Sequence, residues 1–403
     1  MNDEAIRLVE SSAKCSGCGA CMAVCPKQAI TMRPGENGCL YPVIDEGKCV
    51  RCSKCLRICE YASGTVGGNL PWAVYAAAGK DAKLVRSSAS GGVFATLAMS
   101  WIQAGGLVAG AVMDCDGGAQ VYHVLSDKVE DVRRMQGSKY VQSDAWRCYG
   151  KVKAALKSGK CVLFSGTPCQ TAAIRALTGN PEHLVTVELI CHGVPPQTML
   201  DKYVRILSKR FGGMLTGFTF REKRVPKSFC ARLDVIKGTK MRSLYLRSHE
   251  LSFYKYFLEG AIYRENCYTC PYAKEERSSD LTIGDYWGVE KYHADDFASG
   301  TMKKRPDWSC ILVGSAKGEA LLKQHGGALI LHPSRLEWVA VENHQLRHPT
   351  QKPDSRAALL RLYAAGGYSA VEEAFICKSG GRLRYFFRVL KQLRRNRSLI
   401  KDK

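Results

Sequence analysis

The chain has 403 residues, of which 46% are hydrophobic and 24% charged, a balance that is typical of a globular protein and leaves room for two or three domains. The formal net charge of +22 is compatible with nucleic acid, an anionic membrane, an acidic partner or a phosphorylated cofactor, and it does not choose among them. No charged and then apolar leader opens the chain, which argues against secretion. We therefore expect a cytoplasmic protein whose 19 cysteines are metal ligands more often than disulfides.

Two cysteine runs, which begin at Cys15 and Cys49, share the spacing C-x2-C-x2-C-x3-C. In such a run three thiolates wrap one [4Fe–4S] cluster and the fourth reaches across to the other cluster. The predicted ligands are Cys15, Cys18, Cys21 and Cys59 for the first cluster, and Cys25, Cys49, Cys52 and Cys55 for the second. Zinc knuckles and a disulfide framework are the alternatives, but two complete copies, with Pro26 after the first, favour clusters.

This part resembles a bacterial two-cluster ferredoxin over residues 10–62, although Glu60 stands where the pattern usually has proline after the last cysteine. Short strands are predicted at 29–32 and 41–44. Residues 63–71 are rich in glycine and end in proline, which predicts a flexible linker and the clearest domain boundary in the chain.

From residue 72 strands alternate with helices, which predicts an α/β or α+β fold with a mixed sheet. The predicted strands are 73–78, 107–113, 120–125, 161–165, 184–190, 215–220, 231–236, 243–246, 281–284 and 310–314. The predicted helices are 90–103, 144–157, 166–177, 197–211 and 316–324. Residues 87–113 carry no formal charge, but Gly105 and Gly106 divide them, so we expect a buried helix and a buried strand instead of a membrane span.

The tail, residues 378–403, is basic and predicts an amphipathic helix. The residues expected on its apolar stripe are Leu383, Phe386, Phe387, Leu390 and Leu393. Such a helix can lie on a membrane surface, or it can dock on the protein with its charges solvated.

Three segments after the linker are candidates for binding. Ser87–Phe94 offers small residues and a helix start to a phosphate or a flat ring, although its Gly-Gly pair also serves ordinary close packing. Gln136–Tyr140 offers a cation and hydroxyls, or is simply a turn. Ser165–Gln170 joins a strand to a helix, a junction where α/β sheets bind anionic ligands, and it lacks the glycines of a Rossmann motif or a P-loop. Cys169 within it is a nucleophile or a metal ligand.

A fourth segment combines the C-x2-C pair of Cys267 and Cys270 with the run SDLTIGDYWG at 279–288. Together with GTPCQ at 166–170 and CHG at 191–193, these motifs resemble the family of beta subunits of coenzyme F-420 hydrogenases and dehydrogenases over about residues 73–345. The ferredoxin in front is similar to the layout of the electron-input subunit of reduced-F-420 dehydrogenases. The resemblance implies FAD beside Ser90, Gly91, Gly92, Lys139, Gly166, Thr167 and Gln170.

The resemblance also implies a third [4Fe–4S] cluster held by Cys169, Cys191, Cys267 and Cys270, for which the alternative is a structural C-x2-C pair with Cys169 free. The candidate catalytic residues are Lys139, His192 and Asp285. His192 is equally consistent with a structural hydrogen bond, and Asp285 with the cap of a turn. The cysteines expected only to pack are Cys39, Cys115, Cys148, Cys161, Cys230, Cys310 and Cys377.

The expected organisation is a ferredoxin domain (1–62), a linker (63–71), an FAD-binding mixed-sheet domain (72–345) and a basic helical extension (346–403). The leading hypothesis is an FAD-dependent iron–sulfur oxidoreductase that acts on a small two-electron substrate and exchanges electrons with a redox partner protein or ferredoxin. A non-catalytic relay subunit is the alternative, and it would need clusters but no FAD. Nucleic acid is not expected, because the basic residues are spread along the chain without a binding motif.

Overall fold

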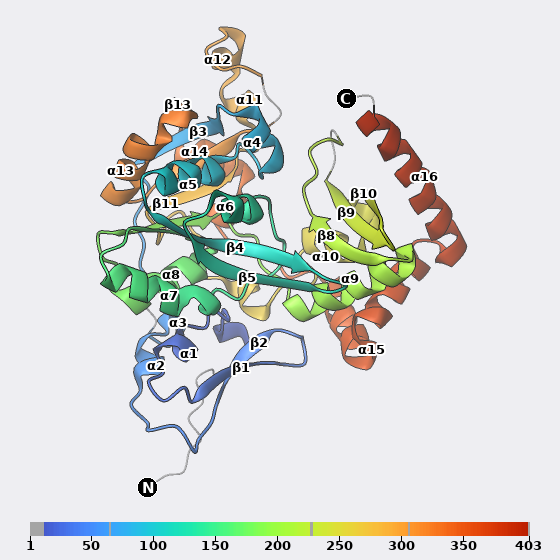
Figure 1. The fold of residues 1–403 in the computed structure, drawn as a ribbon, viewed down its shortest axis with the longest axis horizontal. Coiled ribbons are helices and arrows are strands. Elements are labelled where there is room, and N and C mark those ends of the chain that lie inside the picture. The colour runs from blue at the N-terminus through green and yellow to red at the C-terminus, as the bar shows by residue number, and fades with distance from the viewer. Residues whose placement is uncertain (1–11, 64–65, 226–228, 305–306, 402–403) are drawn as a thin grey trace.

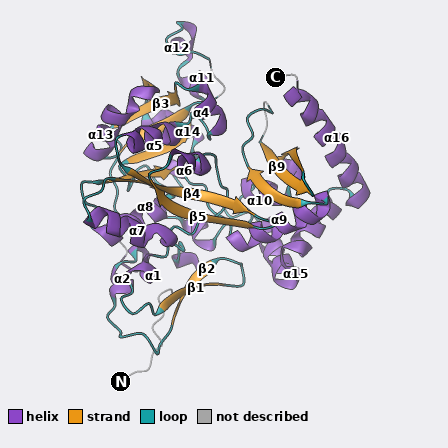
Figure 2. Cartoon of the chain, in the orientation of Figure 1, coloured by secondary structure: helices purple, strands orange, loops and turns teal. Residues whose placement is uncertain are grey.

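The computed structural model describes residues 12–63, 66–225, 229–304 and 307–401 (Figure 1). A small cysteine-rich module at the N-terminus lies below a central eight-stranded sheet, and a three-stranded sheet packs with the C-terminal helices in a lobe beside it. Helices cover both faces of the central sheet (Figure 2). The predicted combination of a ferredoxin-like module with a mixed α/β sheet is confirmed.

The N-terminal module is a short hairpin flanked by single helical turns. Strands β1 (Ile30–Pro34) and β2 (Leu40–Ile44) are antiparallel, with Ile30 opposite Ile44, at the two places where strands are predicted. The turns are η1 (Ser12–Lys14), α1 (Ala20–Val24), α2 (Lys54–Arg57) and α3 (Glu60–Ser63). The cysteine loops therefore have little regular structure of their own, and cluster binding and docking must hold them.

The central sheet is mixed, as the alternation of strands and helices predicts. Its strands are β3 (Ala73–Gly79), β4 (Leu107–Cys115), β5 (Ala119–Ser126), β6 (Val162–Gly166), β7 (Leu184–Leu189), β11 (Leu281–Asp285), β12 (Ser309–Val313) and β13 (Leu329–Pro333). They lie in the order β13-β3-β12-β11-β7-β6-β4-β5. The four strands β11, β7, β6 and β4 are parallel, so their carboxyl ends share one edge, where α/β sheets bind ligands.

Helices pack on the two faces of this sheet. The longer ones are α4 (Ala82–Ser87), α5 (Val93–Gln103), α6 (Val129–Met135), α7 (Trp146–Lys157), α8 (Pro168–Thr178) and α13 (Ala316–His325). The shorter ones are α11 (Val289–Tyr292), α12 (Ala294–Ala298), α14 (Leu336–Glu342), η3 (Glu265–Thr269), η4 (Gly326–Ala328) and η5 (His344–Leu346). On β6, Leu163 joins the core under α5 and α13, whereas Phe164 joins the core under α7 and α8. Both side chains are fully buried, because a parallel central strand has no solvent face.

The uncharged stretch 87–113 forms helix α5 followed by strand β4, both packed in the core, as expected. Within the described ranges, none of the helices combines the length and the hydropathy of a membrane span.

The C-terminal lobe merges part of the central chain with the tail. Its elements are α9 (Gln197–Phe211), β8 (Met214–Thr219), β9 (Cys230–Lys237), β10 (Lys240–Arg247), η2 (Ser248–Glu250), α10 (Ser252–Leu258), α15 (Ser355–Lys378) and α16 (Gly381–Lys401). Tyr203 of α9, Phe253 of α10 and Tyr368 of α15 are fully buried in one core. Residues 346–403 are therefore helical, as predicted, and α15 and α16 complete this core instead of extending away from it.

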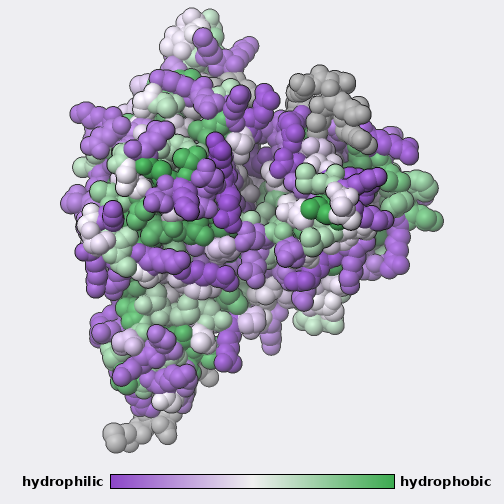
Figure 3. Space-filling view, in the orientation of Figure 1, coloured by the Kyte–Doolittle hydropathy of each residue, from purple (hydrophilic) through white to green (hydrophobic). Residues whose placement is uncertain are grey.

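Helix α16 docks through a different face from the predicted apolar stripe. The Tyr385 hydroxyl donates to the Glu250 carbonyl oxygen at 2.8 Å, and the Arg388 guanidinium contacts the buried Glu250 carboxylate at 2.7 Å. Leu383 and Phe387 of the expected stripe are instead 76% and 67% exposed, and Figure 3 shows apolar colour on the outer side of α16. Hydrogen bonding to Glu250 thus decides which side of the helix is buried, and membrane contact through the exposed side stays a prediction.

The segment after the module is attached to the main domain. Asn69 and Arg277 exchange two backbone hydrogen bonds, of 3.0 and 2.8 Å, and the Lys274 ammonium donates to the Val66 carbonyl oxygen. Residues 64 and 65 of the predicted linker lie outside the described residues. For residues 66–71 the expectation of flexibility is wrong, because their backbone pairs with the loop that follows Cys270.

Buried hydrogen bonds hold the N-terminal module against the main domain. The Gln142 amide donates to the carbonyl oxygens of Ser16 at 2.8 Å and Gly17 at 3.2 Å. The Tyr149 hydroxyl donates to the Cys18 carbonyl oxygen at 3.1 Å. These bonds satisfy backbone carbonyls of the first cysteine loop, which has no strand partner to do so.

Gly19 offers a test of this docking, since it has φ +77 and a Cβ there would lie 2.8 Å from the Trp146 side chain. We expect Gly19→Ala to destabilise the docked module by at least about 1–2 kcal/mol, the cost of left-handed backbone for a non-glycine residue, and to speed its proteolysis. Gly47→Ala is the control, because Gly47 has no such φ and its nearest neighbour would be at 3.4 Å. Equal proteolysis rates and urea midpoints for the two variants would contradict the prediction.

Candidate functional site

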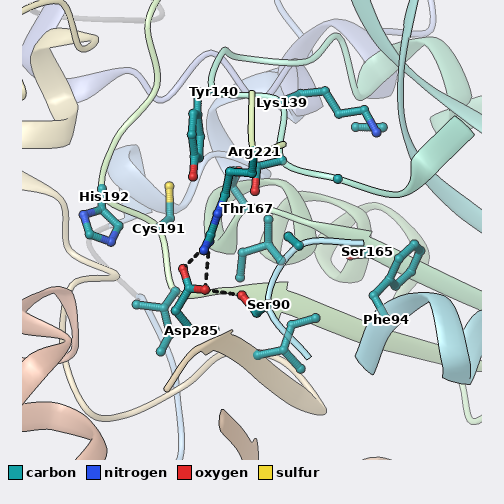
Figure 4. Close-up of a pocket in the computed structure, with 18 of the residues that line it drawn as sticks. Ser90, Phe94, Lys139, Tyr140, Ser165, Thr167, Cys191, His192, Arg221 and Asp285 are labelled. Atoms are coloured by element: carbon teal, nitrogen blue, oxygen red, sulfur yellow. Dashed lines mark hydrogen bonds and ion pairs between the residues drawn. The ribbon is translucent and has the colours of Figure 1, made fainter. Parts of the chain in front are cut away.

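A cavity of about 380 Å³ opens at the carboxyl ends of the parallel strands β6, β7 and β11 (Figure 4). Loop residues 88–92 and 136–141 form further walls. Of the predicted cofactor-binding and catalytic residues, its walls contain Ser90, Gly92, Lys139, Gly166, Thr167, Gln170, His192 and Asp285. The sequence motifs, which are far apart along the chain, therefore meet in one pocket.

Gly91 does not line the pocket but positions its neighbours. Its N–H donates to the Ser309 hydroxyl at 2.9 Å, and a Cβ at this position would lie 2.5 Å from the Ala77 carbonyl oxygen on β3. Only glycine allows this close approach to the sheet. The contact holds Ser90 at the pocket wall, while Gly92, with φ +75, begins α5.

Asp285, at the end of β11, is the centre of a hydrogen-bonded network. The Ser90 hydroxyl donates to its Oδ1, and Arg221 Nη1 donates to both carboxylate oxygens at 2.8 and 2.7 Å (Figure 4). Burial alone would lower the pKa of Arg221, but the negative charges of Tyr140 and Asp285 outweigh burial and raise it. The network fixes one cation and one anion side by side in the pocket wall.

Two aromatic side chains lie at the exposed side of this network. The Arg221 guanidinium is 5.6 Å from the Phe229 ring centroid and 5.8 Å from that of Trp287. Both rings line the pocket, and they are 36% and 39% exposed. They offer a flat apolar surface beside the fixed charges, an arrangement that suits an aromatic ligand.

The Lys139 side chain is engaged elsewhere. Its ammonium donates to the carbonyl oxygens of Arg134, Met135 and Gln136 at 2.8 Å each, at the end of helix α6. It points away from Asp285 and Ser90 in Figure 4. Burial and the Arg134 charge lower the pKa of Lys139 to about 7. All three N–H donors are used within the protein, so the geometry gives this ammonium a role in closing the helix.

Gln170 and Thr167 shape the loop between β6 and α8. Gln170 Oε1 accepts from the Thr167 N–H at 3.1 Å, and its amide donates to the Ser143 carbonyl and hydroxyl oxygens at 2.9 and 3.0 Å. The Thr167 hydroxyl lies 3.2 Å from Cys169 Sγ. Gln170 therefore fixes the loop, while Thr167 lies between the pocket and Cys169.

His123 is a buried pocket residue with an unsatisfied atom. Burial lowers its pKa to about 4, so the ring is neutral near pH 7. Its Nε2 lies 2.9 Å from the Ser165 carbonyl oxygen and must carry the proton, which leaves Nδ1 as an acceptor. Within the described part of the chain, Nδ1 has no hydrogen-bond partner. Such a buried acceptor indicates that a ligand with a donor group completes the pocket.

The cysteines of the N-terminal module gather into the two groups expected from their spacing. Burial, followed by the charges of Cys15 and Cys59, raises the pKa of Cys18 to about 11. The group that lines a cavity of about 40 Å³ is Cys15, Cys18, Cys21 and Cys59. The group that lines a cavity of about 130 Å³ is Cys25, Cys49, Cys52 and Cys55. In the described ranges, no three His, Cys, Asp or Glu side chains converge on a point that would hold a single metal ion.

A third group of cysteines lies between the pocket and the module. Its members, which line a cavity of about 30 Å³, are Cys169, Cys191, Cys267 and Cys270. Burial and the charge of Cys270 raise the pKa of Cys191 to about 12. Four thiols around one small cavity fit a [4Fe–4S] cluster, whose binding would deprotonate them.

Glu60, which replaces the usual proline, serves this third group. Its carboxylate accepts a hydrogen bond from the Tyr272 hydroxyl, and Tyr272 follows Cys270 and Pro271. The departure from the ferredoxin pattern thus joins the module to the loop that carries Cys270.

The remaining cysteines are only partly as expected. Those that are buried, and pack as predicted, are Cys39, Cys148, Cys230 and Cys310, and Cys115 is partly buried. Cys161 and Cys377 are exposed, which corrects the expectation of packing for these two.

Residues 159–335 match the family described as the C terminus of the coenzyme F420 hydrogenase/dehydrogenase beta subunit, and residues 14–63 match the 4Fe-4S dicluster domain. The chain belongs to the family of coenzyme F420 hydrogenase/dehydrogenase beta subunits. The N-terminal module of this family member is a carrier of two [4Fe–4S] clusters.

The family member is 26% identical over 210 residues to the F component of the F(420)H(2) dehydrogenase of Methanosarcina mazei, and the match covers 48% of this chain and 58% of that protein. It thus spans less than two thirds of the length of that relative. A polypeptide from the structure of the F420-reducing [NiFe] hydrogenase complex of Methanosarcina barkeri is 14% identical with a TM-score of 0.44, over 74% of this chain and 94% of that polypeptide.

Sequence reasoning missed Arg221, Phe229 and His123. Each lies outside any motif, and the three come from different parts of the fold: the end of β8, the start of β9 and the middle of β5. Trp287 lay within a quoted motif, but nothing in that motif indicated an exposed ring. Only the folded sheet edge brings these side chains together.

The ion pair in the pocket generates a stability prediction. We expect Asp285→Asn to lower the free energy of unfolding by about 1–3 kcal/mol, because it leaves the Arg221 charge unpaired at a site where the two side chains are only 15% and 24% exposed. Asp131→Asn is the control; it removes a partner of Arg134, whose side chain is 45% exposed, and should cost less than about 1 kcal/mol. Anaerobic urea unfolding measures both, and equal losses would contradict the prediction.

Proposed function

We propose that the family member is an iron–sulfur flavoprotein oxidoreductase that moves electrons between a small two-electron substrate, FAD in the pocket and three [4Fe–4S] clusters. The observation that carries the proposal is a row of shared walls. Cys191 lines both the pocket and the third cysteine cavity, and Cys169 lines both that cavity and the cavity of Cys15 and Cys18. Because electron tunnelling falls steeply with distance, centres held behind shared walls can exchange electrons one at a time.

The pocket residues fit FAD in three respects. The volume of about 380 Å³ lies within the range of roughly 300–1,000 Å³ of cofactor sites. Ser90 and Gly92 leave space at the start of α5, and His123 Nδ1 is an acceptor that awaits a donor. Bound FAD would supply the conversion between two-electron and one-electron transfer.

The Arg221–Asp285 pair would position the substrate. Arg221 keeps Asp285 ionised and fixed, and Ser90 holds its other side, so the carboxylate can accept a donor group from the substrate or from the flavin edge. Phe229 and Trp287 would contact a flat ring entering from solvent. His192, which also lines the pocket, borders the same opening.

The second cluster of the module, with Cys25 and Cys52 among its ligands, would be the exit to a redox partner protein. Cys52 is exposed, and so are the basic residues of the surrounding loops, Lys27, Lys48, Arg51, Lys54 and Arg57. A basic rim around an exposed redox centre favours docking of an acidic partner such as a ferredoxin, and its effect should weaken with salt.

A relay subunit without flavin is the second candidate. The family relationship favours it, because the relative from Methanosarcina mazei is one component of a dehydrogenase. The two candidates differ at the pocket: a relay would purify without FAD and would not be reduced by any small two-electron donor.

Iron content tests the third cluster. Anaerobically purified protein should contain about twelve iron atoms per chain, four for each of the clusters. Cys191→Ala should lower the count to about eight, whereas Cys310→Ala, a buried cysteine outside the three groups, should leave it unchanged. A count of about eight in the unmutated protein would remove the third cluster from the proposal.

Bulky substitutions test the flavin. We expect Thr167→Trp and Gly92→Trp to lose FAD but to retain the two clusters of the module, because each indole would fill the pocket. Gly150→Trp is the control, since Gly150 is exposed on α7 with nothing within 4 Å of an added Cβ. The measurement is flavin absorbance, with and without NADH, F-420 or reduced ferredoxin as donor. No flavin in the unmutated protein would favour the relay, and full flavin in both pocket variants would place the site elsewhere.

A further inference from the structure

Arg264 is a fully buried arginine, 0% exposed, at the seam between the two halves of the chain. It precedes η3 in the main domain, yet its guanidinium reaches the first cysteine loop of the module. Nε donates to the Cys15 carbonyl oxygen at 2.6 Å and Nη2 to Cys15 Sγ at 3.4 Å. Nη1 donates to Gln142 Oε1 at 3.3 Å, and the guanidinium carbon lies 4.3 Å from the Tyr41 ring centroid.

The charge of Arg264 has no carboxylate to balance it among the residues that the structure describes. Other buried arginines do have one: Arg277 pairs with Glu188 at 2.6 Å, and Arg356 pairs with Glu265 at 3.2 Å. An unpaired buried charge is costly, since it loses its hydration without an opposite charge in return. The potential anions that face Arg264 are the thiols of Cys15, Cys39 and Cys267 and the Tyr41 phenol.

The module is shaped to admit this side chain. Gly17 has φ +65, and a Cβ there would lie 2.7 Å from an Arg264 guanidinium nitrogen. Glycine therefore allows both the turn of the cysteine loop and the approach of Arg264 to Cys15. Two separate positions in the sequence, Gly17 and Arg264, are thus adapted to one contact.

We propose that Arg264 is a positioning residue that acts through Cys15 Sγ to raise the reduction potential of the first cluster of the module. Reduction of [4Fe–4S]2+ to [4Fe–4S]1+ takes one electron from the preceding one-electron carrier and adds one negative charge to the cluster and its four thiolates. A fixed cation stabilises the more negative state more strongly, and a hydrogen bond to a ligand sulfur acts in the same direction. The inference rests on the proposed ligands of this cluster, and it needs neither FAD nor the third cluster.

The position of Arg264 also relates this cluster to the next group of cysteines. The Arg264 carbonyl oxygen accepts the Cys267 N–H at 3.0 Å, so one residue contacts a ligand from each group. Raising the potential of the first cluster favours its reduction from the side of the main domain. The main domain therefore sets the direction of electron flow into the module that docks on it.

Midpoint potentials of the complete protein test the proposal. Electron paramagnetic resonance would follow each cluster in dithionite-poised samples, with Cys18→Ala identifying the signal that belongs to the first cluster. We expect Arg264→Met to make reduction of this cluster at least tenfold less favourable, which is about 59 mV for one electron. Arg264→Lys, which keeps the charge, should restore part of the shift, and Arg356→Met, whose charge is already balanced by Glu265, should cause none.

Separate outcomes distinguish the role of Arg264 from the ligand set beneath it. If Cys18→Ala removes no signal, the proposed ligand set fails, and the role of Arg264 fails with it. If the cluster is present and Arg264→Met has the unmutated potential, the role of Arg264 alone is wrong. Should Arg264→Met not fold, Arg264→Lys and Arg264→Gln decide the question: a higher potential in the lysine variant supports the role of the charge, and equal potentials overturn it.

Discussion

The docking of the cysteine-rich module on the main domain is the contact on which the rest of the structure depends. The module has only one short hairpin, and its first cysteine loop relies on Gln142, Tyr149 and Arg264 for hydrogen bonds to its backbone. The same contact brings Cys169 to the cavity wall of the first cysteine group. Without this seam the chain would hold a ferredoxin and a pocket with no short path between them.

The pocket follows from the sheet topology. Parallel strands β6, β7 and β11 end at one edge, so the residues after them converge, although more than one hundred residues separate Thr167 from Asp285. Antiparallel β12 begins at the same edge, where Ser309 holds Gly91 and hence Ser90. The mixed character of the sheet is therefore what adds the serine to the wall of an otherwise parallel site.

Motif spacing predicted the N-terminal module well because cluster ligation is a local constraint. A cubane restricts the distances among nearby cysteines so strongly that the ligand groups can be proposed from spacing alone. Strands and helices of the central sheet were also predictable, since buried apolar runs such as 184–190 alternate with amphipathic ones. The charged network around Asp285 was not, because Arg221 belongs to no motif and reaches the pocket only through the fold.

The C-terminal tail shows where amphipathic pattern fails. Leu383 and Phe387 are more apolar than Tyr385, yet Tyr385 faces the core because its hydroxyl and the neighbouring Arg388 satisfy Glu250. A buried carboxylate without a partner costs more than two exposed apolar side chains. Hydropathy ranks side chains one at a time, and it therefore misses a helix face selected by a single anion on another element.

The separation of Cys15 and Arg264 along the chain has a consequence for biosynthesis. The two residues are 249 positions apart, so at 5–20 residues per second the ribosome makes the cysteine loops about 12–50 s before the arginine that faces them. During that interval the first four thiols are accessible from the side that Arg264 later covers. Iron delivered early reaches an open site, whereas iron delivered after docking must enter a closed one, so the timing of translation limits when the first cluster can be assembled.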